Sequence, residues 1–224
     1  MKDIKIPNKE YSKDRFINVH FPIRGKTLPA DHGYLLYSAI SRLKPELHKT
    51  DWLAVQQISG VPFDQGIVAL PNRGAKVSVR IPADKFGEVI PLAGKKIEID
   101  GHKIRLGIPT AQPLTASPNL YARIVTIRGF MGVPEFLEAA KRQLEELDIK
   151  ATLEIPAEEM SRHRRIITIK DKTIVGFSLI AKNLTDEDSL KLQAYGIGGR
   201  RAMGCGIFNP IFKSMANKEE IEGV

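Results

Sequence analysis

Cysteine is almost absent from this chain, whose 224 residues include one, Cys205. A single thiol cannot form an internal disulfide or supply the thiolates of a zinc finger, so a disulfide scaffold and a cysteine-based zinc site are both excluded. The chain also lacks any run approaching the ~20 apolar residues of a membrane span, and the first 15 residues have no apolar core of a signal peptide. These absences predict a protein of the reducing cytoplasm with no membrane partner.

Acidic residues are outnumbered, with 26 Asp and Glu against 34 Lys and Arg, for a formal net charge of +8. Hydrophobic residues make up 42% and charged residues 27% of the chain, which is typical of a folded globular protein. The basic excess excludes an acidic disordered scaffold and favours a polyanionic partner.

The first half of the chain contains alternating and helical hydrophobic patterns in a recognisable order. We expect a strand at 16–23, then a helix with Asp31 as its N-cap that ends before Pro45. Further strands are expected at 53–59 and 76–81, a short helix at 83–92, and a hairpin over 95–106 with an Asp100-Gly101 turn.

The second half repeats this order of elements after a linker-like stretch at 110–118, which contains two prolines. The expected elements are a strand at 120–128, a helix from Pro134, a strand at 151–155, a hairpin of 165–169 with 173–181, a helix from its cap Thr185 to Tyr195, and a strand at 205–212. We therefore predict an α+β fold of tandem ferredoxin-like (RRM-like) domains, each an antiparallel sheet with helices on one face. The predicted domains are residues 1–115 and 116–224.

A glycine-rich segment, YGIGGRRAMGCGIF, is the most specific motif. Its five glycines lie within eleven residues: Gly196, Gly198, Gly199, Gly204 and Gly206. Glycine permits positive φ and close approach to a ligand, so we expect consecutive N–H groups that point at phosphate oxygens, with Arg200 and Arg201 adding charge. The spacing lacks the Lys-Ser/Thr of a P-loop and follows a helix instead of a strand, and a helix C-cap explains only one or two of the glycines.

This G-x-G-x-x-x-x-x-G-x-G spacing, near the end of a tandem ferredoxin-like chain, resembles the CRISPR-associated protein six family of RAMP endoribonucleases. The stretch LPADHGYLLYSAISRLKPELH, with His32 and His48, is similar to that family's first helix, and the resemblance covers nearly the whole chain. It implies cleavage of precursor CRISPR RNA within its repeats without a metal or other cofactor. It also implies catalytic histidines in the first domain and a glycine-rich loop in the second that holds RNA.

Metal-free cleavage of RNA requires a base for the 2′-OH, charge stabilisation at phosphorus, and an acid for the departing 5′-oxygen. The products are a 2′,3′-cyclic phosphate and a 5′-OH. Histidine titrates near neutrality and suits the proton transfers. We favour His48, which stands beside the cation Lys49, although an exposed helix-end histidine is the simpler structural explanation. His32 is the second candidate, as a neutral base or a contact to the RNA backbone, with an ordinary first-turn helix residue as the simpler explanation. Tyr34 could reach a phosphate or stack on a base, although a core contact is the simpler explanation for it.

No two of the five histidines have the spacing of a metal site, so no metal centre is expected. The basic run Arg162, His163, Arg164 and Arg165 could grip RNA phosphates. The expected partner is CRISPR repeat RNA, with other subunits of an effector complex as further candidates, and the chain could be a monomer or a homodimer. The alternative function is a non-catalytic RAMP subunit that binds guide RNA.

Overall fold

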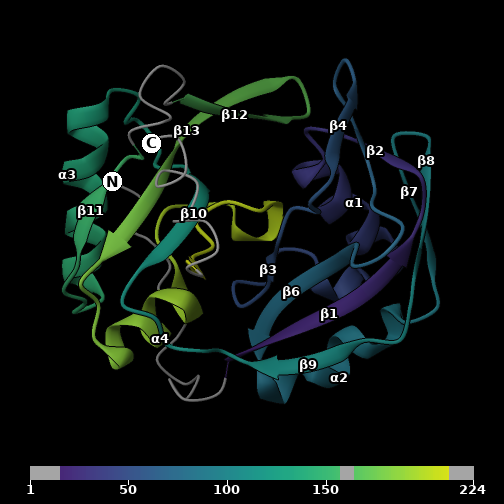
Figure 1. Cartoon of the computed structure of the whole chain (residues 1–224), viewed down its shortest axis with the longest axis horizontal. Coiled ribbons are helices and arrows are strands. Elements are labelled where there is room, and N and C mark those ends of the chain that lie inside the picture. The colour runs from purple at the N-terminus through teal and green to yellow at the C-terminus, as the bar shows by residue number, and fades with distance from the viewer. Residues whose placement is uncertain (1–15, 157–163, 212–224) are drawn as a thin grey trace, which may run out of the picture.

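Two antiparallel sheets with the same strand order make up the two halves of the chain (Figure 1). The computed structural model describes residues 16–156 and 164–211. In the first half the path is β3-β6-β1-β8-β7, with β9 also paired to β1, and in the second it is β11-β13-β10-β14, with β12 also paired to β13. The four strands β3-β6-β1-β8 match β11-β13-β10-β14. Counted by chain order within each set of four, both read second, third, first and fourth, which is the order of the ferredoxin-like fold. The expected tandem ferredoxin-like α+β architecture is therefore confirmed.

The elements of the first half cover residues 16–113. They are β1 (Phe16–Arg24), β2 (Thr27–Pro29), α1 (Gly33–Leu43), η1 (Pro45–Leu47), β3 (Ala54–Val55), β4 (Val61–Asp64), β5 (Ile67–Ala69), β6 (Lys76–Pro82), η2 (Ala83–Lys85), α2 (Phe86–Val89), η3 (Ile90–Leu92), β7 (Lys96–Ile99), β8 (His102–Leu106) and β9 (Thr110–Pro113). Strand β1 alternates as predicted, because Val19, Phe21 and Ile23 enter the core against the buried face of α1.

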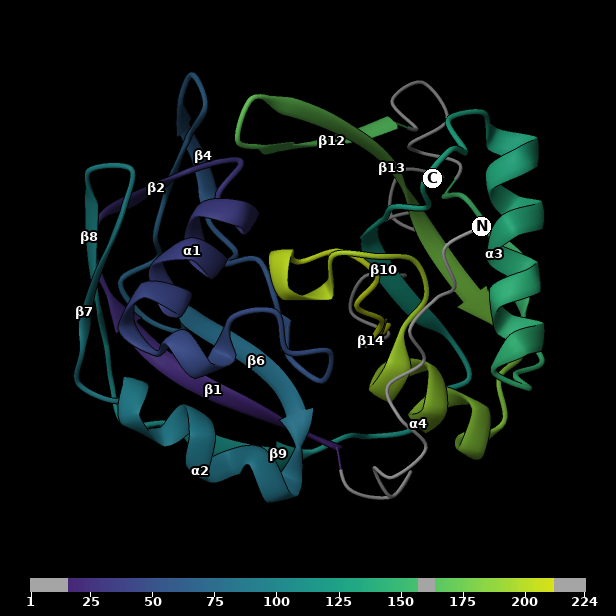
Figure 2. The same ribbon diagram turned by 180° about the vertical axis from the view of Figure 1, so that it is seen from behind.

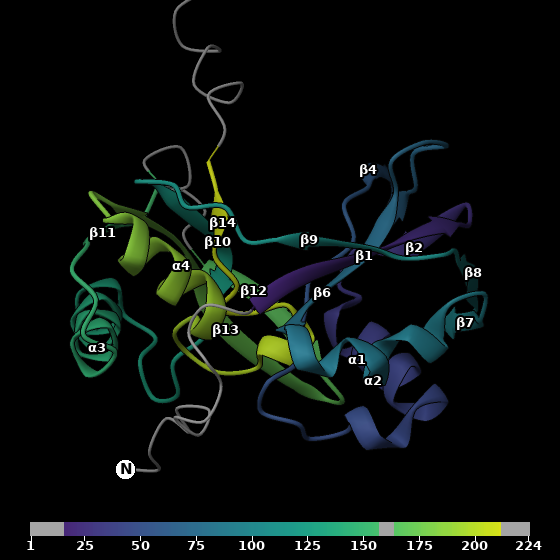
Figure 3. The same ribbon diagram turned by 90° about the horizontal axis from the view of Figure 1, so that it is seen from below.

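The elements of the second half follow from residue 120. They are β10 (Leu120–Val125), α3 (Val133–Glu146), β11 (Thr152–Glu154), β12 (Arg164–Ile169), β13 (Lys172–Lys182), α4 (Asp186–Tyr195), η5 (Arg201–Met203) and β14 (Asn209–Pro210). In Figure 3 the chain can be seen to pass from β9 in the first half toward β10 in the second. The boundary predicted near residue 115 lies between these two strands, and as a division into domains it stays a prediction.

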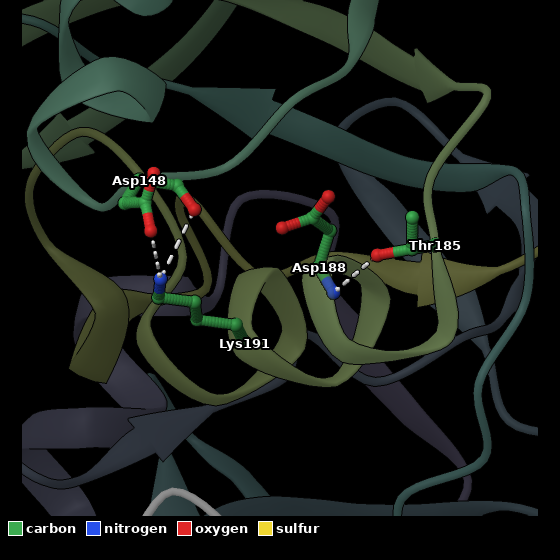
Figure 4. A network of polar contacts seen from close by, with 4 residues as sticks. All are labelled: Asp148, Thr185, Asp188 and Lys191. Atoms are coloured by element: carbon green, nitrogen blue, oxygen red, sulfur yellow. Dashed lines mark hydrogen bonds and ion pairs between the residues drawn. The ribbon is translucent and has the colours of Figure 1, made fainter.

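Helix α4 is fixed at its start and along its length by polar contacts (Figure 4). The Thr185 hydroxyl accepts the N–H of Asp188 at 3.1 Å, which is the N-cap expected from the sequence. The ammonium of Lys191 donates to the carbonyl of Asp148 at 3.0 Å, just beyond the end of α3. The Lys191 contact ties α4 to the chain just after α3.

The two halves meet at Arg80, a completely buried cation on β6. Its Nη1 donates to the carbonyls of Gln193 and Phe208 at 2.9 and 2.7 Å, and its Nη2 donates to Oδ1 of Asn209 at 2.8 Å. Within the first half, its Nε donates to Oδ1 of Asn18 at 2.9 Å. Burial lowers the pKa of Arg80 to about 9, so the guanidinium remains charged at neutral pH. Its charge is solvated by oxygens from both halves.

Two expectations about α1 and α2 are corrected. Asp31 does not cap α1: its carboxylate accepts the N–H of Thr168 on β12 at 2.6 Å, and His32 occupies the N-cap position. The helix expected at 83–92 is broken into η2, α2 and η3, since it contains Gly87 and Pro91, both poor in helix interiors.

Two strand expectations and the expected linker are also corrected, and one small sheet was missed. The strand expected at 53–59 is only β3, and the strand expected at 205–212 is only β14. Gly204 and Gly206 have φ of 87° and 65°, which extended strands do not use. Part of the expected linker at 110–118 is β9, paired with β1, and β2, β5 and β4 form a three-stranded sheet that the sequence pattern did not indicate.

Candidate functional site

His48 lies just after η1, exposed at the surface and next to the exposed Lys49. The chain turns back beyond the end of α1, so the His48 ring stacks on Tyr37 of that helix with centroids 5.8 Å apart and an interplanar angle of 18°. The Tyr37 hydroxyl lies 3.3 Å from Nδ1 of His48 and accepts the backbone N–H of Lys49 at 2.8 Å. Tyr37 therefore holds both the imidazole and the backbone that follows it.

Sequence reasoning did not assign Tyr37 to the site. At 6% exposure it belongs to the buried stripe of α1, and an aromatic residue in such a stripe reads as core. Tyr34, one of the predicted site residues, lies nearly one turn earlier on α1 and is half-buried.

His32 is 1% exposed, and both of its ring nitrogens have backbone partners. Nδ1 donates to the carbonyl of Pro29 at 2.7 Å, and Nε2 accepts the N–H of Ile58 at 2.9 Å. A carbonyl only accepts and an amide N–H only donates, so these partners fix the neutral tautomer with the proton on Nδ1. Burial lowers the pKa of His32 below its usual 6.5, and the charge of Arg123 acts in the same direction. The ring thus holds two chain segments together as a neutral group.

The glycine-rich segment does not present its glycine N–H groups to a ligand, so the expected phosphate-binding array is corrected. All five glycine N–H groups have partners within the chain. They donate to the Leu192 carbonyl from Gly196, to the Gln143 side chain from Gly198, to the Thr126 carbonyl from Gly199, to the Arg201 carbonyl from Gly204, and to the Ile124 carbonyl from Gly206. A Cβ at Gly206 would collide with the carbonyl of Ile197, and one at Gly198 would lie 2.7 Å from that of Thr126. Close packing accounts for these glycines, whereas Gly199 is exposed with open space around it.

The two arginines of the segment have different environments. Arg200 is half-exposed, and its Nη1 donates to the Thr126 hydroxyl at 3.2 Å. The Arg201 guanidinium is buried, which lowers its pKa to about 10, and its Nη2 donates to the carbonyl of Ala194 at 2.6 Å. Arg201 therefore ties η5 to the end of α4, and Arg200 is the better placed of the two to meet a ligand.

The glycine-rich segment and His48 lie along one face of α1. A Cβ at Gly33 would collide with the carbonyl of Met203 in η5, while Tyr37, one turn later, carries His48. Residues four apart share a helix face and are separated by about 6 Å along the axis. Figure 2 shows η5, in yellow, between β10 and α1. The structure thus places η5 and the Tyr37–His48 pair against the same face of α1.

Of the predicted basic run, Arg162 and His163 lie outside the described residues, as does the side chain of Arg164. Arg165 lies on β12 beside the junction of the two halves, and its Nε donates to the Ser178 hydroxyl at 3.2 Å. In residues 16–156 and 164–211, no three His, Cys, Asp or Glu side chains gather as a metal-ligand group. No helix in this part of the chain is long and apolar enough to cross a membrane.

Solved structures with this fold include "CRISPR associated protein Cas6", with a TM-score of 0.66 at 12% identity over 88% of this chain and all of that one. Another is "An RAMP protein binding different RNA substrates", with a TM-score of 0.61 at 15% identity over 88% of this chain and all of that one. The chain thus has the fold class of these two proteins, with tandem ferredoxin-like sheets.

The sequence comparisons identify the family within this class. The family model described as Cas6 Crispr matches residues 17–213. The curated "CRISPR-associated endonuclease Cas6" of Myxococcus xanthus (strain DK1622) is 39% identical over 195 residues, which are 87% of this chain and 81% of that protein. The chain belongs to the Cas6 family, which confirms the resemblance stated from its motifs.

Proposed function

We propose that this chain is an endoribonuclease that cuts precursor CRISPR RNA within its repeats. The Myxococcus relative is named an endonuclease, and the two chains match over most of their lengths. The observation that carries the proposal is the exposed imidazole of His48, held by Tyr37 and adjacent to Lys49. An accessible, oriented imidazole with a neighbouring cation is the minimum that metal-free RNA cleavage needs.

His48 transfers the protons in this mechanism. With Nδ1 turned to the Tyr37 hydroxyl, Nε2 is the nitrogen left to face substrate. When Nδ1–H of the neutral ring donates to the hydroxyl oxygen, Nε2 presents its lone pair and can accept the 2′-OH proton. The resulting imidazolium carries that proton on Nε2 and can pass it to the leaving 5′-oxygen, which returns the ring to its neutral form. Attack of the 2′-oxygen then releases a 2′,3′-cyclic phosphate and a 5′-OH.

Lys49 supplies positive charge for the oxygens on phosphorus. Tyr34 lies on α1, the helix that carries Tyr37, and is available to contact a phosphate or a base. His32 is a weaker candidate for proton transfer, because either ring nitrogen would have to give up a backbone hydrogen bond to reach substrate. Its role here is to position the start of α1.

RNA is held between the two halves by those residues predicted to bind it that are exposed or half-exposed. Gly199, Arg200 and Arg165 are exposed or half-exposed, whereas Gly196, Gly206 and the guanidinium of Arg201 support the segment from within. Phosphate contacts by these arginines supply salt-dependent affinity.

The test incubates the purified chain with its cognate repeat RNA in EDTA, beside the same RNA with a 2′-deoxy sugar at the cut site. The proposal expects one cut in the ribose substrate with cyclic phosphate and 5′-OH ends, and binding without a cut in the deoxy substrate. A requirement for added metal refutes the mechanism. Binding of both RNAs with no products favours the alternative, a RAMP subunit that holds guide RNA without cutting it.

A further inference from the structure

A pocket of about 170 Å³ lies where the two halves of the chain meet. Its walls come from the residues before α1, the residues after β3, and strands β10 and β12, and they are formed by Ala30, Asp31, Gln57, Arg123, Ile124, Arg165, Ile166 and Ile167. In Figure 1 the β12–β13 hairpin extends from the second half toward α1, over this junction. No proton transfer of the proposed cleavage uses the pocket, and of its lining residues only Arg165 also belongs to the proposed RNA-binding set.

Charged groups of both signs are fixed in its walls. Asp31 is held by the Thr168 N–H on one carboxylate oxygen, and Arg165 is held by Ser178 through its Nε. Ser178 is itself fully buried and donates to the carbonyl of Arg123 at 2.7 Å. Burial and the neighbouring charge of Arg165 lower the pKa of Arg123, whereas Asp31 acts in the opposite direction. Two guanidiniums and one carboxylate therefore share the site, with a positive balance.

Two side chains with hydrogen-bond acceptors also line the pocket. The first is Asp31, through its second carboxylate oxygen. The other is Gln57, whose Oε1 is buried without a partner in the described part of the chain, so that this oxygen meets a ligand only when the side chain turns toward the pocket. Such an unpaired buried acceptor costs free energy that a ligand N–H recovers. Ile166, 59% exposed, adds an apolar surface at the rim.

We infer that this pocket binds one base of the RNA substrate, and that the base is guanine. The inference rests on the proposed function, since it takes RNA to be the substrate. The volume is below the 300–1,000 Å³ of typical small-molecule pockets and suits one flat base. Guanine offers adjacent donors at N1 and N2 to match the two acceptors. It also offers O6 and N7, the pair that an arginine fork binds most often. Adenine and uracil cannot match both the two acceptors and the arginine fork.

The test measures binding of the full chain to nine-nucleotide RNAs by fluorescence anisotropy. The probes are U4-G-U4, U4-A-U4, U9, and U4-inosine-U4, in which inosine lacks the N2 amino group. We expect the guanine probe to bind about tenfold or more tighter than the adenine and uracil probes, with inosine in between. Equal binding of all four probes, or a preference for adenine, overturns the inference.

The Asp31→Asn variant keeps an oxygen for the Thr168 N–H but replaces the second acceptor with an amide donor. We expect it to lose the guanine preference. Asp64→Asn is the matched control, because Asp64 is an exposed carboxylate that also accepts a backbone N–H, from Gln65 at 2.7 Å, away from the pocket. Loss of preference in both variants, or in neither, contradicts the assignment.

Arg123→Lys keeps the positive charge and removes the fork, so we expect a smaller guanine preference with little change in affinity for U9. An unchanged guanine preference contradicts the role of Arg123. Cleavage of repeat RNA is scored separately from these probes. If repeat RNA is cut but no base is preferred, the pocket assignment fails alone; if guanine is preferred but repeat RNA is not cut, the nuclease proposal fails alone.

Discussion

Replacing Tyr37 with Phe tests whether the helix positions His48 for chemistry. The Phe ring retains the stacking on the imidazole but removes the hydroxyl that accepts the Lys49 N–H at 2.8 Å and contacts His48 Nδ1 at 3.3 Å. A net 0.5–1.5 kcal/mol per hydrogen bond, with the longer contact at the low end, gives about 1–2 kcal/mol for the pair. Since about 1.4 kcal/mol corresponds to a tenfold change, we expect the cleavage rate to fall about 5- to 30-fold.

The assay is single-turnover cleavage of repeat RNA in EDTA, with RNA affinity measured in parallel. His48→Ala sets the scale: it should lose about 100-fold or more in rate with little change in affinity. The decisive sample is the double variant. If Tyr37 acts through His48, Tyr37→Phe has no further effect on the residual rate of His48→Ala. A wild-type rate in Tyr37→Phe, or the same loss with and without His48, would refute the reasoning.

Three other perturbations have distinct expected outcomes. Burial lowers the pKa of His32 in the folded chain, so folding favours its neutral form. The contribution of His32 to stability is full above about pH 6.5 and is lost as the pH falls from there toward the lowered pKa. Urea unfolding measured at several pH values should therefore show this loss of stability in acid for the wild type and not for His32→Gln. Gly206→Ala places a Cβ against a carbonyl at a φ of 65°, so it should lower the free energy of unfolding by about 2–4 kcal/mol. Gly199→Ala places its Cβ in open space and should change that free energy by no more than about 0.5 kcal/mol. Equal losses in the two variants contradict the packing argument. Arg80→Met leaves the Gln193 carbonyl and its neighbours unpaired and should cost about 2–4 kcal/mol by the same measurement, and a neutral result shows that they find other donors.

Much of the fold could be predicted because its elements have strong local signals. The alternation of β1, the apolar stripe of α3 and the Thr185 cap of α4 each reflect a periodicity or a hydrogen bond within a few residues. The small sheet of β2, β5 and β4 was missed because its strands are three or four residues long and mostly exposed or half-buried. Pairing of such short strands depends on contacts made elsewhere in the chain.

The candidate site was harder to predict, because its contacts join residues distant in sequence. His48 and Lys49 could be selected as neighbours with useful chemistry, but nothing local indicates that His32 receives an N–H from Ile58. The glycine cluster was correctly recognised as unusual, and its physical reason was misassigned. Glycines allow a close approach to a ligand and to the chain's own backbone alike, and only the observed hydrogen bonds distinguish the two.

The oxygens around Arg80 have a consequence for how the chain is made. Its guanidinium belongs to a strand near residue 80, yet three of its acceptors come from positions 193–209. During translation the first sheet emerges with a guanidinium whose Nε can reach Asn18 but whose other two nitrogens only water can solvate. These nitrogens become buried only after their acceptors, 113 to 129 positions further along the chain, have been added. The nascent N-terminal half therefore remains unfinished on the ribosome until the segment that completes it has been synthesised.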